Sequence, residues 1–307
     1  MLRLMSARIL LNEAPRRLVA GSSEWPRSLA DLADPPAQLF VAGRLPPLAH
    51  AVAIVGTRHA DEDACRFTRQ LARELASAGA VIISGGAAGI DGEAHLGALE
   101  AGGQTVAILA LGLRHAYPAH HAPLFAQIAR SGALLCETDT KPVPAGRHLF
   151  LHRNRLIAAL ASAVVVVQAP YKSGALSTAR EARRLKRHMF AVPAAPWDLR
   201  GTGCLQLLRT GTEVCTSAAD ILSVAGLGHR AQTRRGREPE QTTNEINGLA
   251  VEVRKVWRVV GKGAVHPDQI SATLDMPVAE VQEALLTLTL LGLCRQRMDG
   301  TYSACGS

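Results

Sequence analysis

The sequence predicts an α/β protein in which a doubly wound, mostly parallel sheet is followed by a small C-terminal winged helix-turn-helix domain. Between residues 51 and 224, short apolar, β-branched segments alternate with helical segments, as in parallel sheets covered on both faces. This alternation stops in a polar, charged stretch, 226–245, which is typical of a linker. Three helical segments and a hairpin pattern then follow.

The expected strands of the sheet are short runs of apolar residues that are rich in valine, isoleucine and alanine. They are expected at 51–56, 80–84, 104–112, 132–137, 163–169, 188–193 and 213–215. The segments between them have apolar residues at helical spacing, and glycine or proline marks several of their ends. Helices are expected at 61–78, 91–101, 123–130, 154–161, 173–186 (with an opening turn), 204–208 and 218–224.

Four regions are therefore predicted along the 307 residues: a lead-in, 1–45, the sheet domain, 46–225, the linker, 226–245, and the winged-helix domain, 246–307. The lead-in has little periodicity beyond a short helix at 28–32 and a strand at 38–41.

The first 17 residues are interpreted as a short helix or a frayed end. Arg8 interrupts their apolar stretch, and no cleavage site of small residues follows. No apolar run reaches the roughly 18–20 residues that a membrane span needs. A cytoplasmic protein without membrane contact is expected.

The bulk composition describes a globular protein with a sizeable core, since 48% of the residues are hydrophobic and 20% are charged. The six cysteines form neither a CxxC pair nor a cluster with zinc spacing, so free thiols and no metal site are expected. These cysteines are Cys65, Cys136, Cys204, Cys215, Cys294 and Cys305.

The net charge of +8 is concentrated in one segment, 142–190, which has nine basic residues and a single acid, Glu181. The basic residues are Arg147, Arg153, Arg155, Lys172, Arg180, Arg183, Arg184, Lys186 and Arg187. Such a localised surplus points to an anionic partner. The charges of 180–187 could simply be the solvated face of a helix, whereas 147–155 is expected to be a cationic loop.

Small and polar residues follow three of the expected strands, at 56–58, 84–91 and 172–174. The carboxyl ends of parallel strands share one edge of the sheet, where such folds bind ligands. Backbone N–H groups and hydroxyls of these turns can hold an anion there. Any single turn is explained more simply by the need for small residues, but three turns beside a basic segment favour a polyanion site.

Catalytic patterns are sparse, so no enzyme activity and no cofactor are expected. Neither GxGxxG nor GxxxxGK[ST] occurs in the glycine-containing turns. Asp91 and His95 lie four residues apart on an expected helix. A carboxylate that caps the helix or meets its dipole, with His95 packed beside it, explains them better than an acid–base pair. Glu137 and Asp139 could be catalytic or could equally pair with nearby arginines.

Six segments carry motifs that are specific in combination: VAIVGTR (52–58), SGGAAGIDGEAH (84–95), LGLRHAYP (111–118), HLFLHRNRLIAAL (148–160), SGALSTA (173–179) and MFAVP (189–193). Together they resemble the DNA-processing protein A (DprA, or Smf) family over about residues 25–224, and the winged-helix tail also fits. The resemblance implies an extended Rossmann-like domain that binds single-stranded DNA without sequence preference, usually as a homodimer. It also implies protection of incoming DNA during natural transformation and loading of the RecA recombinase.

The resemblance assigns DNA-contacting residues position by position. They are Gly56, Thr57 and Arg58 of the first turn, Ser84, Gly85, Gly86 and Gly89 of the second, Arg147, Phe150, Arg153, Asn154 and Arg155 of the basic segment, and Lys172, Ser173 and Gly174 of the third turn. Arginines neutralise phosphates and make binding salt-dependent, while an aromatic ring can stack on any base. Phe150 could be that ring or could pack in the core.

The alternative function is a nucleotide-binding sensor, or a hydrolase of N-glycosidic bonds in nucleotides, on a related Rossmann-like fold. The same glycine turns would then surround the phosphate of one small ligand. One or two arginines suffice for a nucleotide, whereas a strand needs a track of them, and the basic segment favours the strand.

The winged-helix segment, 246–307, has six basic and six acidic residues and therefore no net charge. Its expected recognition helix, 278–291, carries two acids and no base. A helix that reads the major groove needs donors for phosphates and base edges. This domain is expected to contact protein or to modulate the main domain rather than to bind duplex DNA.

Overall fold

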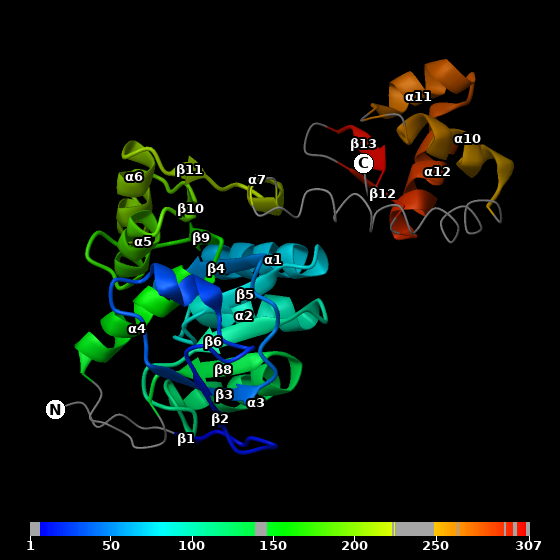
Figure 1. Ribbon diagram of the computed structural model, residues 1–307. Helices are drawn as coiled ribbons and strands as arrows, with labels where there is room; N and C mark the ends of the chain where they lie inside the picture. Colours follow the sequence, from blue (N-terminus) through cyan, green and yellow to red (C-terminus); the bar gives the residue numbers. More distant parts are fainter. Residues whose placement is uncertain are drawn as a thin grey trace. The chain divides into compact units, whose positions relative to one another are not determined.

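The computed structural model describes residues 7–138, 146–222, 224, 249–261, 263, 265–291, 293–296 and 300–304. The chain divides into two compact units, 1–231 and 232–307, each with hydrophobic clusters of its own. The predicted α/β fold with a C-terminal winged helix-turn-helix is confirmed (Figure 1). The predicted linker, 226–245, lies outside the described residues.

Nine strands form the central sheet of the first unit, in the order β11-β10-β9-β4-β5-β6-β8-β3-β2. Their bounds are β2 Arg16–Val19, β3 Gln38–Gly43, β4 Ala51–Val55, β5 Val81–Ser84, β6 Thr105–Ile108, β8 Ala133–Cys136, β9 Ala163–Val166, β10 His188–Ala191 and β11 Glu213–Val214. The strands from β11 to β8 are parallel, and β3 and β2 are antiparallel to their neighbours. The chain order reverses between β9 and β4, where open α/β sheets bind ligands.

Helices cover both faces of this sheet, so strands such as β4 and β9 are buried throughout. The longer helices are α1 Glu62–Ser77, α2 Ile90–Glu100, α3 Ala122–Ser131, α4 Arg147–Leu160, α5 Ala175–Arg184, α6 Thr202–Arg209 and α7 Ala218–Leu222. Helices α4 and α5 pack on one face and α1 and α2 on the other. Three short 3₁₀ segments complete the unit: η1 Arg27–Asp31, η2 Ala119–His121 and η3 Leu199–Gly201.

Helix α4 begins earlier than the sequence predicts. The helix was expected at 154–161 behind a cationic loop, but residues 147–153 already form its first two turns. The expected loop is wrong because the apolar residues that reveal a helical stripe lie only in the second half, where Leu156, Ile157 and Leu160 are buried. The first turns carry charged residues at the carboxyl edge of the sheet.

The N-terminal residues contribute strands to the fold rather than a helix. Strand β1, Ala7–Arg8, pairs with β7, His115–Ala116, and β2 and β3 extend the main sheet. The expected helix or frayed end is therefore wrong for residues 7–17, because β2 acquires its hydrogen-bond partners from β3, about 20 residues further along. The remaining N-terminal residues lie outside the described part.

In the described residues of the second unit, three helices and a hairpin occur, as predicted. They are α10 Val251–Val260, α11 Pro267–Leu274, α12 Val278–Leu290, β12 Cys294–Gln296 and β13 Tyr302–Ala304. Val256, Ile270, Leu285 and Leu288 form the centre of its core. Within the part of the chain that the structure describes, no helix is long and apolar enough to span a membrane.

Candidate nucleic-acid site

A pocket of about 490 Å³ lies at the carboxyl edge of the sheet, next to the point where the strand order reverses. The turn after β4, the first turns of α4 and the start of α5 line it, together with Tyr117. The predicted site residues that it brings together are Gly56, Thr57, Arg58, Phe150, Arg153, Asn154, Ser173 and Gly174. The position of this pocket is the one at which a parallel sheet is expected to bind a ligand.

The turn after β4 is held by its backbone. The Thr57 N–H donates to the Gln168 carbonyl at 2.6 Å, and the Thr57 carbonyl accepts from the Ile90 N–H at 3.2 Å. Gly56 is required here, because a Cβ would lie 2.4 Å from Cγ1 of Ile90. Gly89 has a φ of +75°, and a Cβ on it would lie 2.4 Å from the Thr57 carbonyl oxygen. Close backbone packing therefore fixes the direction in which the next residue, Arg58, leaves the turn.

Arg58 projects from this turn onto two aromatic rings. Its Cζ lies 5.1 Å from the ring centroid of Phe150 and 5.9 Å from that of Tyr117, and the two rings are 5.3 Å apart. The Arg58 side chain is exposed, and it forms no ion pair with a described residue. Phe150 is half-buried and lines the pocket, so it belongs to the site rather than to the core. An unpaired cation beside two ring faces can hold a phosphate and a base together.

Arg153 supports the pocket from within. Its side chain is buried, and Nη1 donates to the carbonyls of Gly85, at 2.6 Å, and Ile108. A Cβ on Gly85 would lie 2.6 Å from Nη2, so glycine is needed there. Burial lowers the pKa of Arg153 to about 10, although nearby Asp91 opposes the shift. The guanidinium ties α4 to the ends of β5 and β6, and any phosphate would compete with these carbonyls.

Asn154 and Arg155 also make contacts within the protein. The Asn154 side chain donates to the Gly174 carbonyl at 3.1 Å, which fixes the turn before α5. Arg155 pairs with Glu137 after β8 and lies outside the pocket lining. Their predicted contacts with DNA stay predictions, and the observed bonds give both side chains a structural role.

The remaining predicted residues lie behind or beside the pocket. The buried Ser84 hydroxyl donates to the Ile54 carbonyl at 2.6 Å. A Cβ on Gly86 would meet the Phe125 ring at 2.6 Å. Lys172 is exposed and lines a neighbouring groove instead. The side chain of Arg147 lies outside the described part of the structure.

The start of α5 faces the pocket through Ser173, Gly174 and Ala175. A helix N-terminus presents unpaired N–H groups and a partial positive charge, which favour an anion. The Ser173 hydroxyl is shielded from solvent and has no hydrogen-bond partner among the described residues. A second set of donors therefore lies across the pocket from Arg58.

Asp91 and His95 are both buried, and Asp91 lies in the first turn of α2 without capping the helix through its side chain. The Ala87 N–H donates to the Asp91 carboxylate at 3.2 Å, and burial raises the pKa of that carboxyl. His95 is fully buried with Nδ1 2.7 Å from the Thr105 hydroxyl, and burial lowers its pKa to about 3. Only Asp91 of this pair reaches the pocket.

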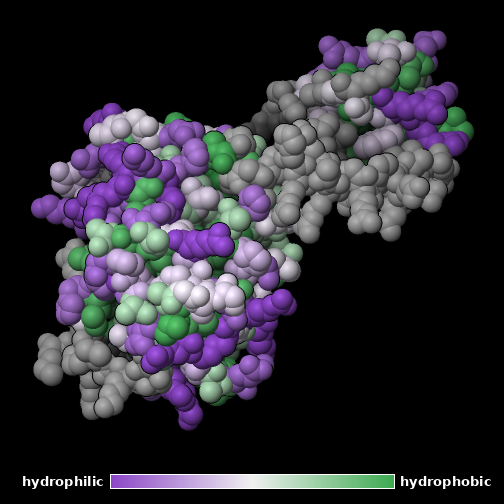
Figure 2. All heavy atoms as spheres, in the orientation of Figure 1, coloured by the Kyte–Doolittle hydropathy of each residue, from purple (hydrophilic) through white to green (hydrophobic). Residues whose placement is uncertain are grey.

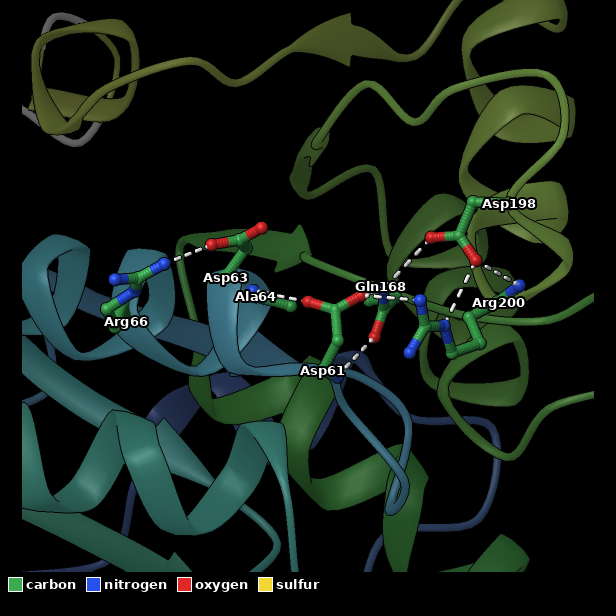
Figure 3. A network of polar contacts seen from close by, with 7 residues as sticks. All are labelled: Asp61, Asp63, Ala64, Arg66, Gln168, Asp198 and Arg200. Carbon is green, nitrogen blue, oxygen red and sulfur yellow. Dashed lines mark hydrogen bonds and ion pairs between the residues drawn. The ribbon is translucent and has the colours of Figure 1, made fainter.

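Sequence reasoning missed a polar network behind the Arg58 turn, centred on Gln168 at the end of β9. Its side chain donates to Asp61, at 2.7 Å, and to Asp198, at 3.2 Å, and Arg200 pairs with both carboxylates (Figure 3). The pKa of Asp61 is lowered because the Ala64 N–H and Gln168 donate to it. This network joins the start of α1 and the segment before α6 to Gln168. The backbone carbonyl of Gln168 accepts from the Thr57 N–H.

Tyr117, within the motif at 111–118, lines the pocket but is absent from the predicted site residues. An aromatic residue in a loop gives no signal that it will meet Phe150, which is far away in sequence. No group of three or more potential ligands that could hold a metal ion occurs among the described residues.

Two family models match the chain: DNA recombination-mediator protein A over residues 16–226, and the DprA winged helix domain over residues 240–300. Among curated relatives, Protein Smf of Synechocystis sp. is 34% identical over 94% of this chain and 80% of its own length. A putative DNA processing protein DprA of Mycobacterium tuberculosis is 41% identical over 82% of this chain, which spans 64% of that relative.

Two solved structures share the fold at 32% identity. DNA processing protein A from Streptococcus pneumoniae matches with a TM-score of 0.64 over 68% of this chain and 74% of that one. The Helicobacter pylori protein, whose single-stranded DNA binding mode was the subject of that structure, matches with a TM-score of 0.60 over 68% and 94%. With its sheet domain and its winged helix both matched, the chain belongs to the DNA recombination-mediator protein A family, also called DprA or Smf.

Proposed function

We propose that this protein binds single-stranded DNA without sequence preference, protects it and loads the RecA recombinase onto it during natural transformation and recombination. The observation that carries the proposal is Arg58, an unpaired cation held against Phe150 and Tyr117 at the carboxyl edge of the sheet. Family membership and the DNA-binding relative from H. pylori support it.

The proposed binding mode follows from the two sides of the pocket. Arg58 neutralises one phosphate. The N–H groups at the start of α5 donate hydrogen bonds to a second phosphate. A base stacks on the Phe150 and Tyr117 pair, which tolerates every base because each has a π face. The activity is binding, with no chemistry performed on the strand.

Fluorescence anisotropy with a labelled dT oligomer tests this assignment. We expect Arg58→Ala to weaken binding about tenfold or more, and to lower the slope of log K against log salt by roughly 0.7, since one phosphate contact is lost. Arg66→Ala is the matched control, because Arg66 is an exposed arginine of α1 that pairs with Asp63 outside the pocket. Unchanged binding by Arg58→Ala would contradict the site.

The rival function, a sensor or hydrolase of a nucleotide, is favoured by one observation: the buried Asp91 carboxyl, with a raised pKa, reaches a pocket of about 490 Å³. Competition experiments separate the two functions. ATP that displaces dT at equal concentration, or release of a free base detected by chromatography, would support the rival. We expect neither result.

The proposal extends to the assembly and its partners: a cytoplasmic homodimer that contacts RecA. Mass measurement by light scattering tests the dimer, and RecA filament formation on single-stranded DNA, with and without this protein, tests the loading. The winged-helix unit is proposed to contact protein, since Glu280 and Glu283 on α12 are exposed and repel phosphates.

A further inference from the structure

A second groove of about 490 Å³ adjoins the pocket of Arg58. Leu151 of α4 and Ser173 before α5 line both, so the two hollows adjoin along these residues. The second groove continues along α5 toward α6, where Figure 2 shows hydrophilic side chains gathered on the surface. Of the residues that line this groove, Lys172 and Ser173 are among the predicted DNA contacts.

The groove is cationic, and its cations form no ion pair with a described residue. Lys172, Arg180 and Arg183 line it, and none of its lining residues is Asp or Glu. Arg180 donates to the Leu176 carbonyl of its own helix, and Arg183 donates to the hydroxyls of Thr210 and Thr212. All of these acceptors are neutral, so the positive charges stay available to an anion.

Two other cations, Arg184 on α5 and Arg187 just after it, form ion pairs, whereas Lys186 forms no ion pair with a described residue and lies outside the groove. Arg184 pairs with Glu181 at 3.2 Å, and Arg187 pairs with Asp31 at 2.7 Å. Neither arginine lines the groove. The helix therefore separates paired cations from unpaired ones, and the unpaired ones are those that face the groove.

The groove also contains an aromatic side chain that is unusually accessible. Tyr171 is 59% exposed, while its N–H donates to the Thr202 hydroxyl at 3.1 Å. The next turn is held by the Ser173 N–H, which donates to the Pro170 carbonyl at 3.1 Å. A ring on a fixed backbone next to three cations has the arrangement of a single-strand stacking platform.

We propose that this groove is a second subsite for the same single-stranded DNA, in which Tyr171 stacks on a base and Lys172, Arg180 and Arg183 hold phosphates. The strand runs from Arg58 over Leu151 and Ser173 to α5. This inference rests on the proposed function and adds a path to it. A strand needs a continuous track of phosphate contacts, and the position of the groove beside the first pocket favours DNA over an acidic peptide.

Binding of dT oligomers of about 4 and about 16 nucleotides, the range that single-strand sites cover, separates the two subsites. We expect Tyr171→Ala and Arg180→Gln each to weaken the long oligomer about tenfold and to leave the short one within about twofold, because the short one fills only the first pocket. Tyr171→Phe keeps the ring and is expected to bind like the wild type.

Arg184→Gln is the matched control, since it removes the same charge from the same helix outside the groove. Arg58→Ala is expected to weaken both lengths. If wild-type protein binds neither oligomer, the proposed function fails. If Arg58→Ala weakens both while Tyr171→Ala and Arg180→Gln weaken neither, only the second subsite is overturned. Loss of the dimer mass in these two variants, with long-oligomer binding unchanged, would make the groove a protein interface and overturn it too.

Discussion

Two arginines of the recognised motifs, Arg58 and Arg153, differ in what surrounds their guanidinium groups. Arg58 is exposed against two rings, whereas Arg153 is buried and donates to the Gly85 and Ile108 carbonyls. From residue type alone, both arginines are predicted to bind a phosphate. Burial distinguishes the two, because Nη1 of Arg153 is already bonded to two carbonyls, while its buried Nε has no partner among the described residues.

Arg153→Met is expected to lower the free energy of unfolding by about 2–5 kcal/mol, because two buried carbonyls lose their donor. Urea unfolding measures this change. Arg58→Met, at an exposed position, is the control and is expected to stay within about 0.5 kcal/mol. A fully stable Arg153→Met protein that no longer bound dT would instead make Arg153 a direct phosphate ligand.

His95 makes stability depend on pH. Its folded-state pKa of about 3 lies below the ordinary 6.5, so between these values the folded chain binds fewer protons than the unfolded chain. Stability contributed by neutral His95 is therefore present above pH 6.5 and is lost as the pH falls toward 3. The loss is at most about 1.4 kcal/mol per pH unit.

Urea unfolding at pH 7.5 and pH 5 measures this loss, with His95→Leu for comparison. The pKa of buried Asp91 is raised, so this residue acts with the opposite sign in both proteins. The difference between their two pH profiles therefore isolates His95. Identical profiles would contradict the assignment.

At the scale of elements, the contact between α1 and α2 positions the Arg58 turn. Helix α2 begins next to Thr57, and Gly97 in its middle lies against α1. A Cβ on Gly97 would lie 2.2 Å from the Arg69 carbonyl oxygen. On the exposed rim of the same contact, Arg69 pairs with Glu93 and Glu100. Such surface pairs are worth little, so close backbone packing dominates the contact.

Gly97→Ala is expected to lower the free energy of unfolding by about 1–3 kcal/mol, since the two helices must separate to admit the methyl group. In an isolated helix the same change stabilises by about 1 kcal/mol, so the sign of the effect is diagnostic. Gly174→Ala is the control, because a Cβ there meets no atom within 4 Å. Thermal and urea unfolding measure both variants, and a stabilised Gly97→Ala protein would contradict the packing.

At the scale of the whole molecule, the two compact units carry different surfaces. The first unit, 1–231, holds both hollows along the proposed DNA path. The second unit, 232–307, has a core of its own around Val256 and Leu288. The proposed DNA path therefore lies on the first unit, and the winged helix belongs to the second unit.

A chain that ends at residue 231 is expected to bind the long dT oligomer within about threefold of the full chain, a difference of about 0.7 kcal/mol. Anisotropy measures it under identical salt conditions. Fragment 232–307 is expected to bind no duplex DNA at moderate salt, because α12 carries two acids and no basic residue. Duplex binding by that fragment, or loss of dT binding by the shorter chain, would reverse this division of roles.

The sequence determined the alternation of strands and helices, because period and apolar composition are local properties of a segment. The apolar run at 163–169 predicts the buried strand β9, and the helical stripe at 61–78 predicts α1. The winged helix was likewise predictable from its three stripes and its hairpin. Motifs at the strand ends lie at the carboxyl edge of the sheet beside the pocket, since the carboxyl ends of parallel strands meet there.

The tertiary structure alone decided what each side chain of that edge does. Arg153 bonds a carbonyl 68 residues away, and Tyr117 meets Phe150 from another loop, so neither contact has a local signature. Strand β2 and the early start of α4 depend in the same way on partners elsewhere in the chain. Which cations of α5 face the second groove is also set by α4 and α6, which line it together with α5. Charge can be read from sequence, but its availability depends on burial and partners, which only the folded chain defines.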